Sequence, residues 1–470
     1  MADETSKFSK VLSSKDILAL AFGAMIGWGW VVLAGGWVSR AGSLGAIIAF
    51  ALGGLMVIFV GLTYAELTAA MPKCGGEHVF SHRALGHNMS FVCTWAIVLG
   101  YVSVVAFEAV ALPTVIEYLF PNYKQGFMYS VAGWDVYLTW VLVGMLASIA
   151  ITVLNYFGVK PAALVQGVVT IMIALVGIAF LGGALTNGDS ANLTPLFIDG
   201  TKGIFAVAIM TPFMYVGFDV IPQAAEEINM EPRNIGKILL LSVVMAIVWY
   251  AAIILGVSLA LDHAGLQGAQ LATADSMQAV FSSPLAAKVM ILAGIGGILT
   301  SWNSFFVGGS RAIYAMAASG MLPPFLSFLH PKYKTPTNAI LMIGLFSSLA
   351  PLCGRKMLVW LVDAGGLAIV ISYFLVALSF LVLRHREPEM ERPYLIKAGK
   401  TVGVIAMILS FGMALLYMPG APAALLWPYE WLIFLGWWLL GGVFLAWAKL
   451  AGGNARLARN LEQNPLAELD

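Results

Sequence analysis

The chain has 470 residues, of which 60% are hydrophobic and 10% charged, and its formal net charge is +1. Because a soluble domain carries about 25% charged residues, this composition excludes an ordinary soluble protein. Apolar runs such as 45–62 and 238–261 are long enough to cross about 30 Å of hydrocarbon. Strict alternation, which a membrane β-barrel needs, is absent. The sequence therefore predicts an all-α polytopic membrane protein, and no nucleic acid is expected as a partner.

Hydropathy predicts about twelve membrane-spanning helices in chain order. They are expected at 16–39, 43–70, 90–119, 136–156, 161–186, 201–225, 236–261, 286–317, 337–353, 357–384, 401–419 and 429–449. With the N-terminus inside, 18 of the 25 lysines and arginines fall on the cytoplasmic side and six on the other. This excess predicts that both termini are cytoplasmic. No removable signal peptide is expected before Asp16.

The first predicted span contains the stretch GAMIGWGWVVLAGG at 23–36, with five glycines. Each glycine inside a helix costs about 1 kcal/mol relative to alanine. Glycines permit unwinding, which exposes backbone amides that can bind a carboxylate at a positive helix end. The alternative is that Gly23, Gly27 and Gly29 only allow neighbouring helices to pack closely.

The sixth span has a matching interruption. Residues 211–219 read TPFMYVGFD, and Pro212 removes a helical hydrogen bond while Gly217 weakens the helix further. Broken backbone at membrane depth must line an enclosed or watery cavity. Two broken spans in corresponding positions indicate an inverted-repeat transporter whose half-helix ends meet near the midplane. The expected units are a cytoplasmic segment 1–15, a first five-helix repeat 16–186, a second inverted repeat 201–384, two additional helices 401–449 and a cytoplasmic tail 450–470.

Five motifs in order resemble those of the amino acid/polyamine/organocation transporter superfamily. They are GAMIGWG (23–29), MPKCGGEHVFSHRALG (71–86), YVGFDVIPQAAEEINMEPRN (215–234), SRAIYAMAASGMLP (310–323) with HPKYKTP (330–336), and RHREPEMERPY (384–394). The resemblance implies a five-plus-five inverted fold with two extra helices, and alternating-access transport of an amino acid or amine. Trp28 departs from it, since many relatives have a small or hydroxyl residue there. An indole can donate a hydrogen bond but cannot replace that hydroxyl, which suggests a small substrate or an aromatic-walled amine site.

Candidate substrate-binding residues come from the first, third and sixth spans. Tyr101, Val105 and Glu108 share one helical face because they are spaced i, i+4 and i+7. By the resemblance, this face contributes to the substrate cavity and Phe213 is a lid over the substrate. Trp28 is predicted as a second gate residue. The full set is Met25, Ile26, Gly27, Trp28, Gly29, Tyr101, Val105, Glu108, Phe213, Met214, Tyr215 and Gly217. Phe213 and Tyr215 could also serve in packing alone.

Three residues are candidates for proton coupling. The resemblance implies that the Lys160 ammonium bridges the first and eighth spans near Ser301 and Ser304. A buried lysine can release and regain a proton, although a lysine at the membrane edge can also extend to water. Glu108 could shuttle a proton, pair with a substrate ammonium or serve a structural ion pair. Asp219, which follows the broken segment of the sixth span, is the third candidate and could also serve gating or a conformational hydrogen bond. Asp363, near the start of the tenth span, is a weaker candidate for a functional role.

Other chemistry finds little support in the sequence. His78, His82 and His87 cluster before the third span, where a solvated loop is expected rather than a metal site. No cysteine pair, nucleotide-binding glycine loop or nucleophile–base pair is present, so no metal, cofactor or enzymatic activity is expected.

The sequence therefore predicts a secondary transporter of the inner or plasma membrane. Its substrate is expected to be a small amino acid or related amine, moved by symport with protons or by exchange. Two alternatives remain: a polyamine or amine permease in which Glu108 neutralises the substrate cation, and a membrane receptor that binds without translocating.

Overall fold

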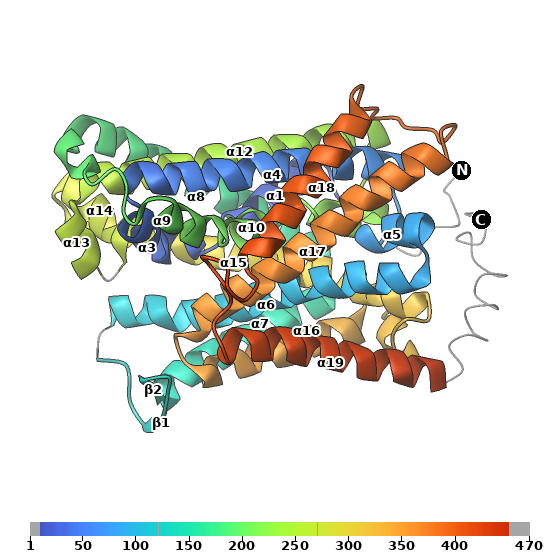
Figure 1. Cartoon of the computed structure of the whole chain (residues 1–470). Coiled ribbons are helices and arrows are strands. Elements are labelled where there is room, and N and C mark those ends of the chain that lie inside the picture. The colour runs from blue at the N-terminus through green and yellow to red at the C-terminus, as the bar shows by residue number, and fades with distance from the viewer. Residues whose placement is uncertain (1–9, 121, 270, 451–470) are drawn as a thin grey trace.

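The computed structural model describes residues 10–120, 122–269 and 271–450, and within 159–165 it describes the backbone alone. Figure 1 shows a bundle of long helices that run roughly side by side. The helices of the first half are α1 (Ser14–Met25), α2 (Gly29–Val32), α3 (Ala34–Ala41), α4 (Ser43–Ala70), α5 (Glu77–Leu85), α6 (His87–Leu119), α7 (Leu138–Phe157) and α8 (Val159–Asn187). Those of the second half are α9 (Gly200–Ala208), α10 (Thr211–Tyr215), α11 (Val220–Gln223), α12 (Pro232–Ala260), α13 (His263–Gly268), α14 (Ala272–Phe281), α15 (Pro284–Ala318), α16 (Thr337–Leu349), α17 (Met357–Arg386), α18 (Gly399–Leu416) and α19 (Tyr429–Leu450).

The predicted all-α membrane architecture is confirmed. Eleven helical segments of the described chain are long and apolar enough to cross a membrane. The ninth predicted span, 337–353, is helical over its whole length, but only Thr337–Leu349 (α16) is α-helical and Ala350–Cys353 forms a 3₁₀ turn. Pro351 lies inside that turn, and a proline cannot continue an α-helical hydrogen-bond ladder.

Both predicted interruptions are present in the structure. The first span stops being helical after Met25 and resumes at Gly29. The sixth span is divided into α9, α10 and α11, and residues 216–219 between the last two are not α-helical. The inverted relation between the two halves stays a prediction.

The described chain begins and ends at the same end of the bundle, on the right in Figure 1, and we call this the terminal end. At the opposite end lies a two-stranded antiparallel hairpin, β1 (Phe127–Val131) and β2 (Trp134–Tyr137), which the hydropathy pattern did not indicate. The short helices α13 and α14 lie at that opposite end as well (Figure 1).

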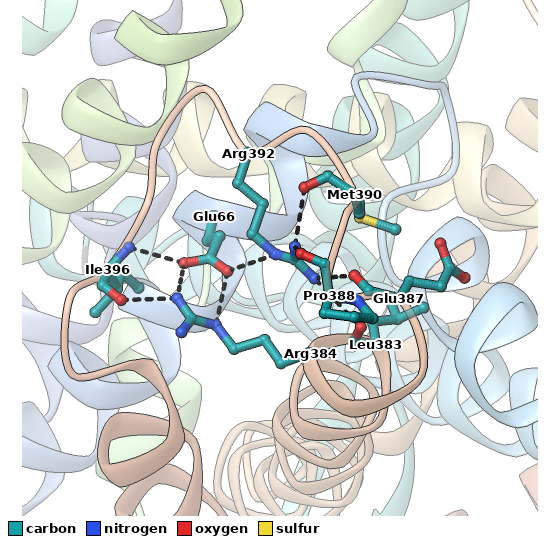
Figure 2. A network of polar contacts seen from close by, with 8 residues as sticks. All are labelled: Glu66, Leu383, Arg384, Glu387, Pro388, Met390, Arg392 and Ile396. Atoms are coloured by element: carbon teal, nitrogen blue, oxygen red, sulfur yellow. Dashed lines mark hydrogen bonds and ion pairs between the residues drawn. The ribbon is translucent and has the colours of Figure 1, made fainter.

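A buried carboxylate organises the terminal end (Figure 2). Glu66, at the end of α4, is 1% exposed and accepts two hydrogen bonds from Arg384, at 2.9 and 2.5 Å. Arg392 lies 3.1 Å from the same carboxylate, and the backbone N–H of Ile396 donates to it at 2.8 Å. These contacts fold the segment between α17 and α18 back onto α4.

The expectation of a solvated histidine loop is wrong for His78. Its side chain is only 5% exposed, and its ring nitrogen Nδ1 lies 3.1 Å from the hydroxyl of Ser90. Burial lowers the pKa of His78 to about 3, so it is neutral at physiological pH. The helix α5, which carries His78, is packed against α6 and α17 and is part of the bundle wall.

Candidate substrate site

The two broken spans touch each other at their breaks. Gly217 has a φ of +140°, and a Cβ added there would lie 2.8 Å from the Cβ of Ala24 and 3.0 Å from the backbone nitrogen of Met25. Only glycine combines this backbone conformation with so close an approach. The glycine in the sixth span therefore lets the end of α1 and the second break pack directly together.

The breaks leave backbone groups without partners. The N–H groups of Gly27 and Gly29 donate no hydrogen bond to any residue the structure describes. Likewise, the carbonyls of Phe213, Met214 and Tyr215 accept none within the described chain. One group at the second break is satisfied, because the N–H of Gly217 donates to Oδ1 of Asp219 at 2.8 Å. The site thus presents bare donors on one span and bare acceptors on the other.

Glu108 brings a carboxyl group to the first break. It is 1% exposed, and its Oε1 accepts a long hydrogen bond, 3.5 Å, from the backbone N–H of Trp28. A Cβ added at Gly27 would lie 2.4 Å from Oε1 of Glu108 and 2.8 Å from the hydroxyl of Ser301. The other oxygen, Oε2, has no hydrogen-bond partner among the described residues. Gly27 is therefore required for Glu108 to approach the unwound backbone.

The Trp28 ring lies in a notch of α15. A Cβ added at Gly294 would lie 1.9 Å from the Trp28 ring, so the notch exists because residue 294 is glycine. The end of α1 is held from another side, where the hydroxyl of Tyr250 donates to the Met25 carbonyl at 2.7 Å. Met214 of the sixth span lies beside Tyr250, with its sulfur 3.9 Å from the hydroxyl.

The remaining residues of the predicted set are buried around these groups. Phe213 packs edge-on against Phe107, with ring centroids 5.6 Å apart. Tyr215 instead faces α4, where its hydroxyl donates to the Phe50 carbonyl at 3.1 Å. Val105 is fully buried, and its backbone carbonyl accepts a hydrogen bond from Ser347 of α16. The gating roles of Phe213 and Trp28 stay predictions.

The residues of the predicted third-span face lie in two separate parts of the structure. Glu108 lies at the first break, whereas Tyr101 lies beside Asp219 and Glu77, nearer the terminal end. Asp219 accepts a hydrogen bond from Tyr373 of α17 at 3.3 Å through Oδ2. The structure therefore separates Tyr101 and Asp219 from the Glu108 group.

The proposed lysine bridge lies outside what the structure describes, because Lys160 is among the residues whose side chains are not described. Gln166, further along α8, bridges the first and eighth spans instead. Its amide donates to the Ala19 carbonyl at 3.4 Å, the Thr300 carbonyl at 3.1 Å and the Ser304 hydroxyl at 3.0 Å.

Three polar residues of this region escaped sequence reasoning. Gln166 could have been noticed as an amide in an otherwise apolar span, since such groups are costly without partners. Tyr250 gives no comparable signal, because a tyrosine in an apolar helix is common at interfaces. Glu77 stands inside the loop motif at 71–86, where an acidic residue is expected to be solvated.

Comparison with known proteins places these features in a family. Residues 12–443 match the family model described as amino acid permease. The branched-chain amino acid permease BcaP of Bacillus subtilis is 27% identical over 82% of this chain and 83% of its own length. The methylthioribose transporter of the same organism is 25% identical over 93% of both chains, and its aspartate-proton symporter is 24% identical over 85% of this chain and 78% of its own. These relatives are transport proteins and not enzymes. The chain, with its two broken spans in contact, belongs to the amino acid permease family.

Proposed function

We propose that the protein is a secondary active transporter of a small amino acid or a related amine. The observation that carries the proposal is the presence of bare backbone donors at Gly27 and Gly29 on one broken span and of bare acceptors at Phe213–Tyr215 on the other. A buried polar group without a partner costs about 1–3 kcal/mol. A substrate that has both an acidic and an amino group would satisfy both sides at once.

The substrate carboxylate would bind the N–H groups of the first break, where the helix dipole also favours an anion. The ammonium group of the substrate would bind the carbonyls of Phe213, Met214 and Tyr215. Glu108 would lie nearby and select among substrate side chains. Names of the relatives support this class of substrate, since they include branched-chain amino acid, aspartate and γ-aminobutyric acid carriers.

Alternating exposure would follow from rocking of the first and sixth spans against the surrounding helices. We further propose that the terminal end faces the cytoplasm of a cell membrane and that Lys160, Glu108 and Asp219 couple transport to protons. Proton coupling is supported by the relative that is named an aspartate-proton symporter.

Uptake by purified protein in sealed proteoliposomes tests the proposal. We expect radiolabelled amino acids or amines to accumulate, and to accumulate more when the outside is acidic. The Lys160→Ala variant should insert normally but lose the effect of the pH gradient. Binding without accumulation would contradict transport and favour the receptor alternative. Uptake by Lys160→Ala that still responds to the pH gradient would show that Lys160 is not needed for coupling.

An amine permease is a second candidate, favoured by the position of Glu108. Its carboxyl already lies on the Trp28 amide, where a substrate carboxylate would otherwise bind. A substrate without a carboxylate would leave Glu108 in place and pair with it. Competition between an amino acid and its decarboxylated amine for the same uptake separates the two candidates.

A further inference from the structure

A closed cluster of polar side chains lies between the substrate site and the terminal end. It contains two carboxyl groups, Glu77 at the start of α5 and Asp219 at the end of the second break, and both are fully buried. Three tyrosines from α4, α6 and α17 and one glutamine from α11 complete it. These are Tyr64, Tyr101, Tyr373 and Gln223.

Two donors reach the Glu77 carboxyl. The Tyr64 hydroxyl donates to Oε1 at 3.0 Å, and the Gln223 amide donates to Oε2. Neither Glu77 nor Asp219 forms an ion pair with a described lysine, arginine or histidine. The titratable groups that face Glu77 from the neighbouring elements are the phenols of Tyr64, Tyr101 and Tyr373, the thiol of Cys93 and the carboxyl of Asp219. None of them supplies positive charge.

Two buried polar atoms of the cluster lack a partner. The Tyr101 hydroxyl lies beside both carboxyl groups and Gln223 without a hydrogen bond of standard geometry, and Oε1 of Gln223 has no partner among the described residues. Both side chains are fully buried. An acceptor such as Oε1 can pair with a carboxyl group only if that group carries a proton. The Tyr101 hydroxyl can donate its own hydrogen to Oε1 of Gln223, so these two atoms require no proton on either carboxyl group. What distinguishes the cluster is that its two buried carboxyl groups are met by neutral donors and by no described cation.

The cluster also holds the second half of the sixth span in place. The N–H of Gly75 donates to the Gln223 carbonyl at 3.4 Å, and a Cβ added at Gly76 would lie 3.0 Å from the Cβ of Pro222. The loop before α5 thus lies directly on α11. Two negative charges enclosed here would repel each other and push α11 away from α5, whereas one bound proton removes that repulsion.

We propose that Glu77 is a proton-binding site whose occupancy keeps α11 docked on α5, and whose deprotonation opens the terminal end. Burial, followed by the charge of Asp219, raises the pKa of Glu77 well above its usual range, which agrees with this role. The coupling of this proton to substrate movement rests on the proposed transport function. The site itself does not, because a proton binds whether or not substrate is carried.

Thermal unfolding of the purified protein against pH tests the site without any substrate. A carboxyl group whose pKa is raised by folding binds more protons in the folded state, so its contribution to stability falls as pH rises. One such proton changes the folding equilibrium by up to about tenfold per pH unit. We expect Glu77→Gln, which is neutral and similar in shape, to flatten this decline and to melt higher than the natural protein at pH 8.

Glu226→Gln is the matched control. Glu226 lies in the 3₁₀ turn Ala225–Glu227 that follows α11, is only half-buried and accepts a hydrogen bond from the N–H of Cys74 at 3.1 Å. We expect this variant to keep the pH dependence of the natural protein. A lower melting temperature for Glu77→Gln at every pH, with an unchanged slope, would identify Glu77 as a permanently ionised structural carboxylate and overturn the proposal.

If Glu77→Gln fails to fold, Tyr64→Phe tests the same site. Loss of the phenol removes a donor that favours the carboxylate, so the pH dependence should move to higher pH. A uniform drop in melting temperature with no movement along the pH axis would contradict the proposal. The proposed transport function is tested separately. If the melting behaviour is as expected but no uptake is measured, the proton site is supported and the transport function is contradicted.

Discussion

At the scale of single residues, Glu108 and Gly27 form one unit. The hydrogen at Gly27 is what lets the carboxyl of Glu108 approach the unwound backbone, since a methyl group would lie 2.4 Å from Oε1. The carboxyl in turn gives the break an acidic group that the backbone alone lacks. A carboxyl buried in an apolar span without an ion-pair partner among the described residues is costly unless a ligand or proton uses it.

Glu108→Gln should therefore change which substrates the protein carries. The amide keeps the shape and one acceptor oxygen but removes the charge, so pairing with a substrate ammonium weakens. We expect uptake of an amine without a carboxylate to fall at least tenfold, equivalent to about 1.4 kcal/mol, and uptake of a zwitterionic amino acid to change less. Initial rates in proteoliposomes over a range of substrate concentrations measure both.

Glu117→Gln is the control for this prediction, since it lies on the same helix but pairs with Lys124 at 2.7 Å at the other end of the bundle. It should transport both substrates as the natural protein does. Equal rates for Glu108→Gln and the natural protein on both substrates, with an unchanged pH profile, would assign Glu108 a structural role.

At the scale of elements, the sequence located the broken helices well and their contacts poorly. Glycine and proline weaken a helix by local effects, so Gly27, Pro212 and Gly217 marked the breaks correctly. Which side chains meet at the breaks depends on rotation and approach of distant helices, which a single span does not encode. For that reason Tyr250 and Gln166 were missed, and Tyr101 was placed with Glu108 although it lies with Asp219.

Gly217→Ala tests whether contact between the two broken elements is needed. The added methyl group meets the Cβ of Ala24 at 2.8 Å, and the φ of +140° is one that alanine rarely adopts. We expect the two breaks to separate and uptake to fall at least tenfold, with the protein still inserted. The same assay applied to Gly412→Ala in α18, where a Cβ meets nothing within 4 Å, should give normal uptake and equal or slightly higher stability.

At the scale of the whole molecule, hydropathy predicted an all-α bundle. Lipid offers no hydrogen-bond partners to the backbone, and a long apolar segment satisfies its own backbone groups by forming a helix. The same reasoning could not predict the hairpin at 127–137, which lies beyond the apolar spans. The arginine-rich segment after α17 was recognised as a motif, but its folding back onto Glu66 becomes visible only in three dimensions (Figure 2).

This fold-back makes Glu66 a stabilising residue for the entire terminal end. Its carboxylate joins α4 to the segment before α18 through Arg384, Arg392 and the backbone of Ile396 (Figure 2). Removing it leaves two largely buried guanidinium groups without their anion. Breaking a buried ion pair in this way costs about 3–5 kcal/mol. We expect Glu66→Ala to lower the free energy of unfolding by about that amount.

Reversible unfolding in mixed detergent micelles measures this loss, and Glu387→Ala is the matched control. Glu387 pairs with Arg83 at 2.6 Å, but the two side chains are 31% and 21% exposed, so the pair is worth at most about 1 kcal/mol. Because both carboxylates hold the same segment, the difference between the variants isolates the effect of burial. Equal losses would mean that the segment is held by its apolar contacts, and that the network in Figure 2 sets its position without stabilising the fold.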